Sequence, residues 1–238
     1  MGDKGLNDLL RWSIENSATG PDGTTNAPPR STLNQEALAA MMGGPSDADL
    51  MRESMAAITS PDPEISLESR LTAFDNFEQL IESLDNANLL SKLGLWTPLL
   101  ECLAHDEAEM RLMAAWCVGT AVQNNEPSQE RLVALGGIEK LVQMAVGKRL
   151  PAPSTSAEAI NGDNKKDEEE TKNVRRKALY ALSSAVRNYQ PAMDVCAAEL
   201  RRQGHGENAG EEGKAIDATD MDAVDTVIGG LREKVTNA

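Results

Sequence analysis

The chain has 238 residues, a formal net charge of −15 and an aromatic content of only 3%. The negative charge disfavours nucleic acid and anionic membrane surfaces as partners, because both require clustered Lys and Arg side chains. The low aromatic content disfavours a large β-sandwich or barrel, and the Ala-, Leu-, Met-, Glu- and Lys-rich composition favours helices. No run of 18 apolar residues occurs in the sequence, so we expect no membrane-spanning helix.

The first thirty residues are predicted to form a flexible segment with one short amphipathic helix, at residues 6–15. Its apolar residues recur at helical spacing. They are Leu6, Leu9, Leu10, Trp12 and Ile14. The stretch that follows, up to about residue 30, is rich in Gly, Pro, Asn and Thr, which is typical of a linker. The N-terminus lacks the long apolar core of a signal peptide, and we therefore expect a cytoplasmic protein.

Residues 31–203 carry the main helical signal and are predicted to form one repeat domain. Short helices are expected at residues 33–42 and from Ser46 or Asp47 to about Ile58. From Pro63 to about residue 147 the apolar residues keep an i, i+3, i+4 rhythm. The rhythm breaks at Gly94, near His105, at Pro127 and at Gly136.

The C-terminal half contains a region without apolar periodicity. Residues 151–173 carry a charge run, and we interpret them as a disordered insertion in the repeat domain. Helices are expected from about 174 to 189 and from Pro191 to Gln203. Residues 204–238 are predicted to be a linker followed by one last helix, whose apolar residues lie between Met221 and Val235.

The sequence repeats itself with a period of about 41–42 residues. The pattern of Arg, Leu and Ala that begins at Arg70 recurs at Arg111, and Gly94 recurs as Gly136 between matching leucines. A third copy begins at Arg175, displaced by about the length of the insertion. This period is typical of HEAT and armadillo units, in which each helix pair buries its apolar face against its neighbours.

Two stretches resemble the armadillo repeat: LVALGGIEKLV at 132–142 and AAWCVGTAVQNN at 114–125. The resemblance implies an all-α, armadillo-like solenoid in which long third helices line a concave face. Together with LNDLLRWSIENS at 6–17, these stretches resemble the armadillo-type nucleotide exchange factors of Hsp70, in particular the short fungal form. This resemblance implies a protein that clasps the nucleotide-binding domain of Hsp70, favours ADP release and promotes release of the client.

Candidate contact residues follow from the repeat register and the helical period. Residues at i, i+3, i+7 and i+10 of a long helix share one stripe, and the stripes of successive units are expected to lie side by side. The predicted partner-binding residues are Asp75, Gln79, Glu82, Met113, Trp116, Thr120, Gln123, Asn124, Lys177, Tyr180, Ser184 and Arg187. Aromatic and Arg side chains are common interface anchors. The alternative is that Trp116 and Tyr180 merely pack between units.

A separate hypothesis concerns the function of residues 6–15. Its Leu-rich sequence beside Arg11 resembles what Hsp70 accepts as a client peptide, and tethering would raise its effective concentration. It would then occupy the client site and prevent a released client from rebinding. The alternative is a helix docked on the first repeat.

Other classes of function find little support in the sequence. His105 and His205 are interpreted as surface residues, and Cys102, Cys117 and Cys196 as small buried hydrophobic residues without metal-ligand spacing. No phosphate-binding loop is present. We therefore expect no catalytic residue, no cofactor and no metal, and a monomer. The alternative function is an armadillo-type scaffold or adaptor without exchange activity.

Overall fold

The computed structural model describes residues 44–151, 169–210 and 213–237. Two compact units divide the chain after Ser46, and the account below concerns the second unit, which begins at Asp47. The helices predicted at 6–15 and 33–42 lie outside the described residues, as does the apolar segment with Leu6, Leu9, Leu10, Trp12 and Ile14.

The regular secondary structure in the described part of the chain is all helical, apart from one isolated bridge between Lys148 and Glu169. Its α-helices are α3 (Asp47–Ile58), α4 (Leu67–Ile81), α5 (Leu84–Leu93), α6 (Trp96–Glu101), α7 (Ala108–Val122), α8 (Glu126–Ala134), α9 (Gly137–Ala145), α10 (Lys172–Val186), α11 (Gln190–Arg202) and α12 (Met221–Asn237). Two short 3-10 helices, η1 (Cys102–Ala104) and η2 (Gly206–Asn208), lie between them. None of the described helices is long and apolar enough to cross a membrane.

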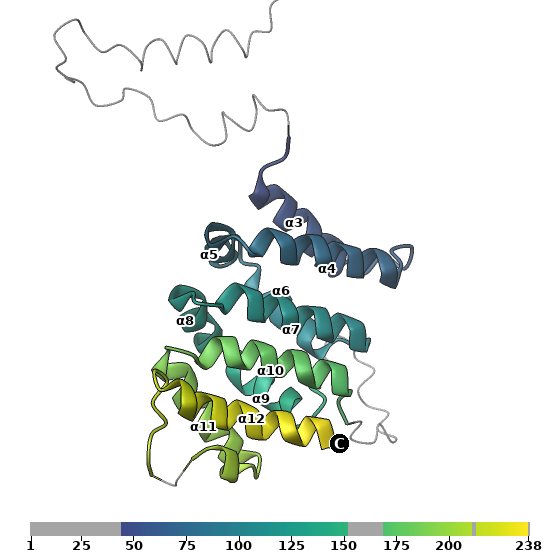
Figure 1. The fold of residues 1–238 in the computed structure, drawn as a ribbon. Coiled ribbons are helices and arrows are strands. Elements are labelled where there is room, and N and C mark those ends of the chain that lie inside the picture. Colours follow the sequence, from purple (N-terminus) through teal and green to yellow (C-terminus); the bar gives the residue numbers. More distant parts are fainter. Residues whose placement is uncertain (1–43, 152–168, 211–212, 238) are drawn as a thin grey trace, which may run out of the picture. The chain divides into compact units, whose positions relative to one another are not determined.

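Four long helices, α4, α7, α10 and α12, lie side by side as the rungs of a ladder (Figure 1). The shorter helices α5 and α6 connect α4 to α7, and α8 and α9 connect α7 to α10. A short first helix, a second helix and a long third helix thus recur along the chain. The predicted all-α, armadillo-like solenoid is confirmed.

The helix α12 belongs to this solenoid, whereas the sequence suggested only a linker and a terminal helix for residues 204–238. Its apolar residues are buried in the same core as the rest of the unit; they are Val224, Val227, Ile228, Leu231 and Val235. Polar contacts add to the docking: the Asn188 amide donates to the Ala218 carbonyl at 2.9 Å, and Lys172 Nζ donates to the Thr236 carbonyl at 2.7 Å. The helix therefore forms a fourth rung against α10.

The glycines that aligned in the sequence occupy the same backbone conformation. Gly94 has φ of 70° and Gly136 has φ of 69°, and each lies between the first and second helices of its unit. Residues with a side chain rarely adopt this left-handed conformation, which explains why glycine recurs. Asn124 and Asn188 form a second such pair, with φ of 51° and 57°, in the turns that follow α7 and α10.

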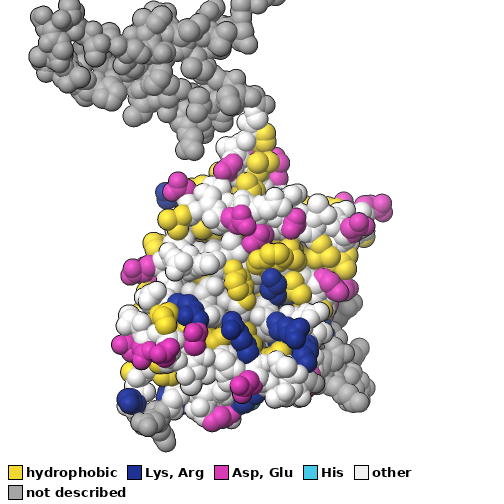
Figure 2. Space-filling model, viewed as in Figure 1, with side chains coloured by type: hydrophobic (Ala, Val, Ile, Leu, Met, Phe, Trp, Pro, Cys, Tyr) yellow, Lys and Arg dark blue, Asp and Glu magenta, His cyan; other side chains and the backbone are white. Residues whose placement is uncertain are grey.

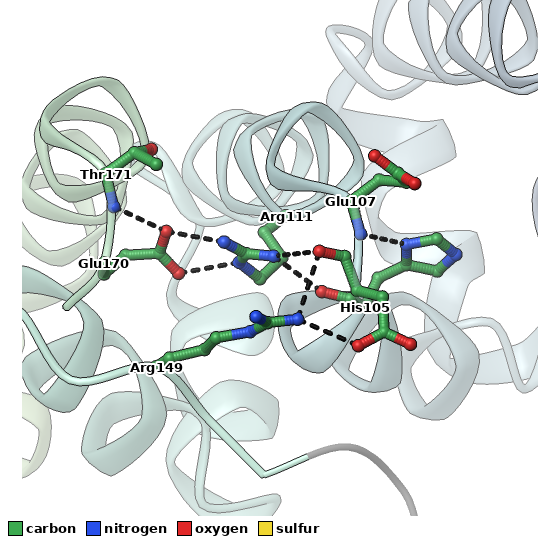
Figure 3. Close-up of polar contacts among 7 residues, drawn as sticks. His105, Glu107, Arg111, Arg149, Glu170 and Thr171 are labelled. Atoms are coloured by element: carbon green, nitrogen blue, oxygen red, sulfur yellow. Dashed lines mark hydrogen bonds and ion pairs between the residues drawn. The ribbon is translucent and has the colours of Figure 1, made fainter. Parts of the chain in front are cut away.

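The arginine that begins each sequence copy ties its long helix to the preceding segment. Arg70 donates to the Ile58, Asp62 and Ile65 carbonyls. Arg111 donates to the His105 carbonyl at 2.8 Å and the Asp106 carbonyl at 2.7 Å (Figure 3). Arg175 donates to the Ala145 carbonyl at 3.3 Å. The recurring arginine therefore has a structural role at the start of three rungs.

Arg111 also forms a buried ion pair with Glu170. Its Nε and Nη2 atoms lie 2.6 and 2.7 Å from the two carboxylate oxygens, and the side chains are 4% and 0% exposed (Figure 3). The Thr171 amide donates to the same carboxylate at 2.8 Å, and the Glu170 amide donates to the Gly147 carbonyl. The pair therefore holds the start of α10 against the start of α7.

These contacts correct the boundaries of the predicted insertion. The sequence placed residues 151–173 in a disordered stretch, but residues 169–173 are ordered and α10 begins at Lys172. Glu169 and Glu170 were counted as part of a solvated charge run. The Glu170 carboxylate is instead buried against Arg111, 59 residues away. The Glu169 carboxylate pairs with Arg175, six residues further on, but is 71% exposed. Residues 152–168 lie outside the described residues.

We predict that Arg111→Ala lowers the free energy of unfolding by about 3–5 kcal/mol, because it leaves the buried Glu170 carboxylate without its counterion. Urea unfolding followed by circular dichroism measures this change. The matched control is Arg52→Ala, which breaks an ion pair with Asp49 whose side chains are both 55% exposed. The control should cost no more than about 1 kcal/mol. Equal losses in the two variants would contradict a structural role for the buried pair.

Candidate partner-binding face

The predicted contact residues lie on one continuous surface, formed by the outward sides of α4, α7 and α10. We call this surface the ladder face. Figure 2 shows it with acidic side chains over α4, apolar side chains in the middle, and Lys and Arg side chains gathered over α10, with side chains of both signs towards α12. The two signs of charge are thus separated between α4 and α10, although the chain as a whole is strongly acidic.

The structure brings the predicted stripes of the three helices together. On α4 and just after it, Asp75, Gln79 and Glu82 are exposed. On α7 and the turn after it, Met113, Trp116 and Thr120 are half-buried, while Gln123 and Asn124 are exposed; on α10 and its end, Lys177, Tyr180, Ser184 and Arg187 are half-buried. On the opposite side of α7, Ala115, Val118 and Val122 are buried in the core. Leu112 is half-buried and borders the ladder face.

The centre of the ladder face is a cluster of two aromatic rings and one ammonium group. Lys177 Nζ lies 3.6 Å from the centroid of the Trp116 ring and 5.6 Å from that of the Tyr180 ring. Such cation–π contacts stabilise the ammonium at a partly desolvated site. Burial nevertheless lowers the pKa of Lys177, and the nearby Glu78 carboxylate acts in the opposite direction. The cluster joins α7 to α10.

Tyr180 has a packing role in addition to its exposed edge. Its ring lies against Gly119 of α7, where a Cβ atom would come within 2.5 Å of a ring carbon. Its hydroxyl donates to Gln123 Oε1 at 3.4 Å. Tyr180 therefore packs between two units, as the alternative interpretation proposed. Trp116 and Tyr180 are only half-buried, so part of each ring also remains exposed to a partner.

Arg187 is anchored to the fourth rung. Its guanidinium forms an ion pair with Asp225 of α12 and contacts the Met221 sulfur at 3.2 Å. Its Nε also donates to Ser183 Oγ at 3.3 Å. The sequence did not pair Arg187 with α12, because the two lie 38 residues apart along the chain, beyond a second linker. The contact fixes the position of the guanidinium at the edge of the ladder face.

Three hollows mark the ladder face. The first, of about 450 Å³, is lined by Glu78, Glu82, Trp116, Thr120, Gln123, Asn124 and Tyr180, and we call it the carboxylate hollow. The second, of about 650 Å³, is lined by Leu67, Glu68, Leu71, Thr72, Asp75, Met113 and Trp116. The third, of about 400 Å³, is lined by Leu112, Asn173, Arg176, Lys177 and Tyr180. Most of the predicted residues therefore line hollows that a partner can fill, whereas Gln79, Ser184 and Arg187 line none of these three.

Glu78 is the residue of this face that the sequence analysis missed. It is only 6% exposed, and its Oε1 accepts a hydrogen bond from Thr120 Oγ1 at 2.7 Å. A signal was available, because position 78 belongs to the same helical stripe as Asp75 and Glu82. Its burial is not visible in the sequence, because a glutamate within a polar stripe is usually solvated.

The nucleophilic and titratable groups elsewhere do not gather into a site. Burial raises the pKa of the Cys102 and Cys196 thiols to about 12 and that of Cys117 well above its ordinary value. These thiols are buried and free, as the sequence predicted. Burial also lowers the pKa of His105 and His205. Among the residues that the structure describes, no group of His, Cys, Asp and Glu could hold a metal ion.

Known proteins resemble this chain along its whole length. Residues 6–90 match a family model described as nucleotide exchange factor Fes1. The chain is 54% identical over 239 aligned positions to the Hsp70 nucleotide exchange factor FES1 of Gibberella zeae, with all of both chains covered. It is 47% identical to the Neurospora crassa protein of that name, covering 99% of this chain and all of the relative. The Saccharomyces cerevisiae protein is 40% identical over 76% of this chain and 56% of its own length.

Proposed function

Because the chain belongs to the Fes1 family of Hsp70 nucleotide exchange factors, we propose that it binds the nucleotide-binding domain of Hsp70 through the ladder face. The 54% identity over the whole of both chains is the observation that supports exchange activity. The chain acts as a nucleotide exchange factor and a co-chaperone of Hsp70. The assignment of the ladder face to this partner rests on the geometry described above.

The mechanism needs no covalent chemistry. Suppose that a protein binds nucleotide-free Hsp70 more tightly than ADP-bound Hsp70. By thermodynamic linkage, it must weaken ADP binding by the ratio of these two affinities. ADP then dissociates, ATP enters and the client is released. We therefore propose a protein without catalytic residues, cofactor or metal, which acts as a monomer in the cytoplasm.

The ladder face suits this task because it is rigid. Its side chains project from helices that share one hydrophobic core, and several of them are held by neighbours on the next rung. A rigid surface can impose its shape on a partner, since little of the binding energy is lost in ordering it. The separated charges of the face would orient a partner that carries the complementary pattern.

We predict that the protein accelerates release of a fluorescent ADP analogue from Hsp70 many-fold at near-equal concentrations, and that it hydrolyses no ATP alone. Stopped-flow fluorescence with excess unlabelled ATP measures the release rate. If the two proteins bind each other while the release rate is unchanged, exchange activity is excluded and an armadillo-type scaffold or adaptor is favoured.

A second prediction concerns the anchors of the ladder face. Tyr180→Ala combined with Arg187→Ala should weaken Hsp70 binding by about 2 kcal/mol or more, as expected for interface hot spots. Isothermal titration calorimetry measures the affinity. Because Arg187 pairs with Asp225, the matched control is Asp225→Asn, which breaks the ion pair but keeps the guanidinium. Unchanged affinity in the double variant, with intact helicity, would remove both residues from the interface.

A third prediction concerns residues 6–15, which lie outside the described residues. We propose that their apolar side chains, Leu6, Leu9, Leu10, Trp12 and Ile14, occupy the client site of Hsp70 and prevent rebinding of a released client. Deleting residues 1–30 should leave ADP release intact but slow the net escape of a fluorescent client peptide. A truncated protein that clears the client as fast as the full chain, or that loses thermal stability, would contradict this.

A further inference from the structure

The carboxylate hollow carries more negative than positive charge, because among the described residues its two carboxylates have only Lys177 nearby, beyond ion-pair distance. Glu78 and Glu82 contribute two carboxylates, and in the described part of the chain neither forms an ion pair with a Lys or Arg. Thr120 is the only described donor to the Glu78 side chain, although that residue is just 6% exposed. A carboxylate that is largely removed from water and lacks a cation is costly, unless a ligand supplies the missing charge.

Lys177 is the nearest cation, and its position leaves the hollow incompletely neutralised. Its ammonium lies over the Trp116 ring and pairs with neither carboxylate. With Lys177 counted, one negative charge remains uncompensated. Arg187, at the end of the same helix, is already paired with Asp225 of α12. The ladder face therefore offers room for one further positive charge at this point.

The remaining walls of the hollow suit a planar cation. Trp116 and Tyr180 supply aromatic rings, and Gln123 and Asn124 supply side-chain amides beside the two carboxylates. An arginine guanidinium stacks on aromatic rings and donates up to five hydrogen bonds in a fixed fork. A lysine ammonium lacks the planar shape that uses both kinds of wall. The volume of about 450 Å³ is ample for the end of such a side chain.

We propose that the carboxylate hollow receives one arginine side chain from the surface of the Hsp70 nucleotide-binding domain, with Glu78 and Glu82 as its counterions. This inference rests on the proposed function, because it names the chemistry by which the ladder face recognises that partner. The hollow would also orient the partner. A single charge pair at the acidic end of the ladder fixes the angle at which the partner docks.

The test compares two pairs of isosteric substitutions in the full chain. Glu78→Gln with Glu82→Gln removes both charges from the hollow, and glutamine keeps the acceptor for Thr120. The matched control, Glu101→Gln with Glu130→Gln, removes two exposed charges from α6 and α8 and so changes the net charge equally. Affinity for intact ADP-bound Hsp70 is measured by calorimetry, and thermal unfolding checks that each variant is folded.

We expect the hollow variant to bind Hsp70 at least about tenfold more weakly than the unsubstituted chain, and the control to bind within about twofold of it. A panel of single Arg→Ala substitutions on the surface of the nucleotide-binding domain then identifies the cation. One of them should weaken binding to the unsubstituted chain but not to the hollow variant.

Three results would overturn the proposal. Equal weakening in the hollow variant and the control would mean that only net charge matters. Unchanged affinity in the hollow variant would show that the carboxylates are not used, and the absence of any coupled arginine would exclude the named cation. If the unsubstituted chain itself fails to bind Hsp70, the proposed function falls first, and this result is distinct from the other three.

Discussion

The first three rungs of the ladder depend on one interaction, made by an arginine in the first turn of α4, α7 and α10. A solenoid of short helices can bury its apolar side chains in more than one rotation of each rung, because Ala and Leu pack tolerantly. Arg70, Arg111 and Arg175 remove that freedom by reaching back to carbonyls of the preceding segment. The start and the rotation of these three rungs are thereby fixed. Because the rotation is fixed, the outward stripes of α4, α7 and α10 meet in one face.

The repeat itself was accessible from the sequence because its signals are local. A glycine in a left-handed turn and an apolar rhythm of 3.6 residues depend on neighbours a few positions away, so Gly94 and Gly136 marked the register. The burial of Glu170 and the docking of α12 against α10 were not predicted, for the opposite reason. The counterion of Glu170 is 59 residues distant, and α12 follows a Gly-rich stretch that resembles the end of a domain. Nothing local distinguishes a glutamate in a buried pair from one in a solvated charge run.

The sequence predicted which residues of the candidate site share a face, but not which of their side chains contact each other. Helical period and repeat offset together placed Trp116, Lys177 and Tyr180 on one face. The position of the Lys177 ammonium over the Trp116 ring depends on the distance between α7 and α10. That distance is set by Gly119, against which the Tyr180 ring lies. Glu78 is buried for a similar reason, since its exposure is decided by α7 rather than by its own helix.

A protein that promotes nucleotide exchange only by binding Hsp70 needs a surface that distinguishes between two conformations of its partner. The partner must be held more tightly in one conformation than in another, so the contacts that discriminate must not follow the partner as it moves. Flexible surface charges would follow it, and they would bind both conformations alike. Charges held by a contact with the next rung do not: Glu78 is held by Thr120, and Arg187 by Asp225. These two fixed charges lie on different rungs and have opposite signs. They therefore define a direction on the ladder face, which a uniformly acidic surface would lack.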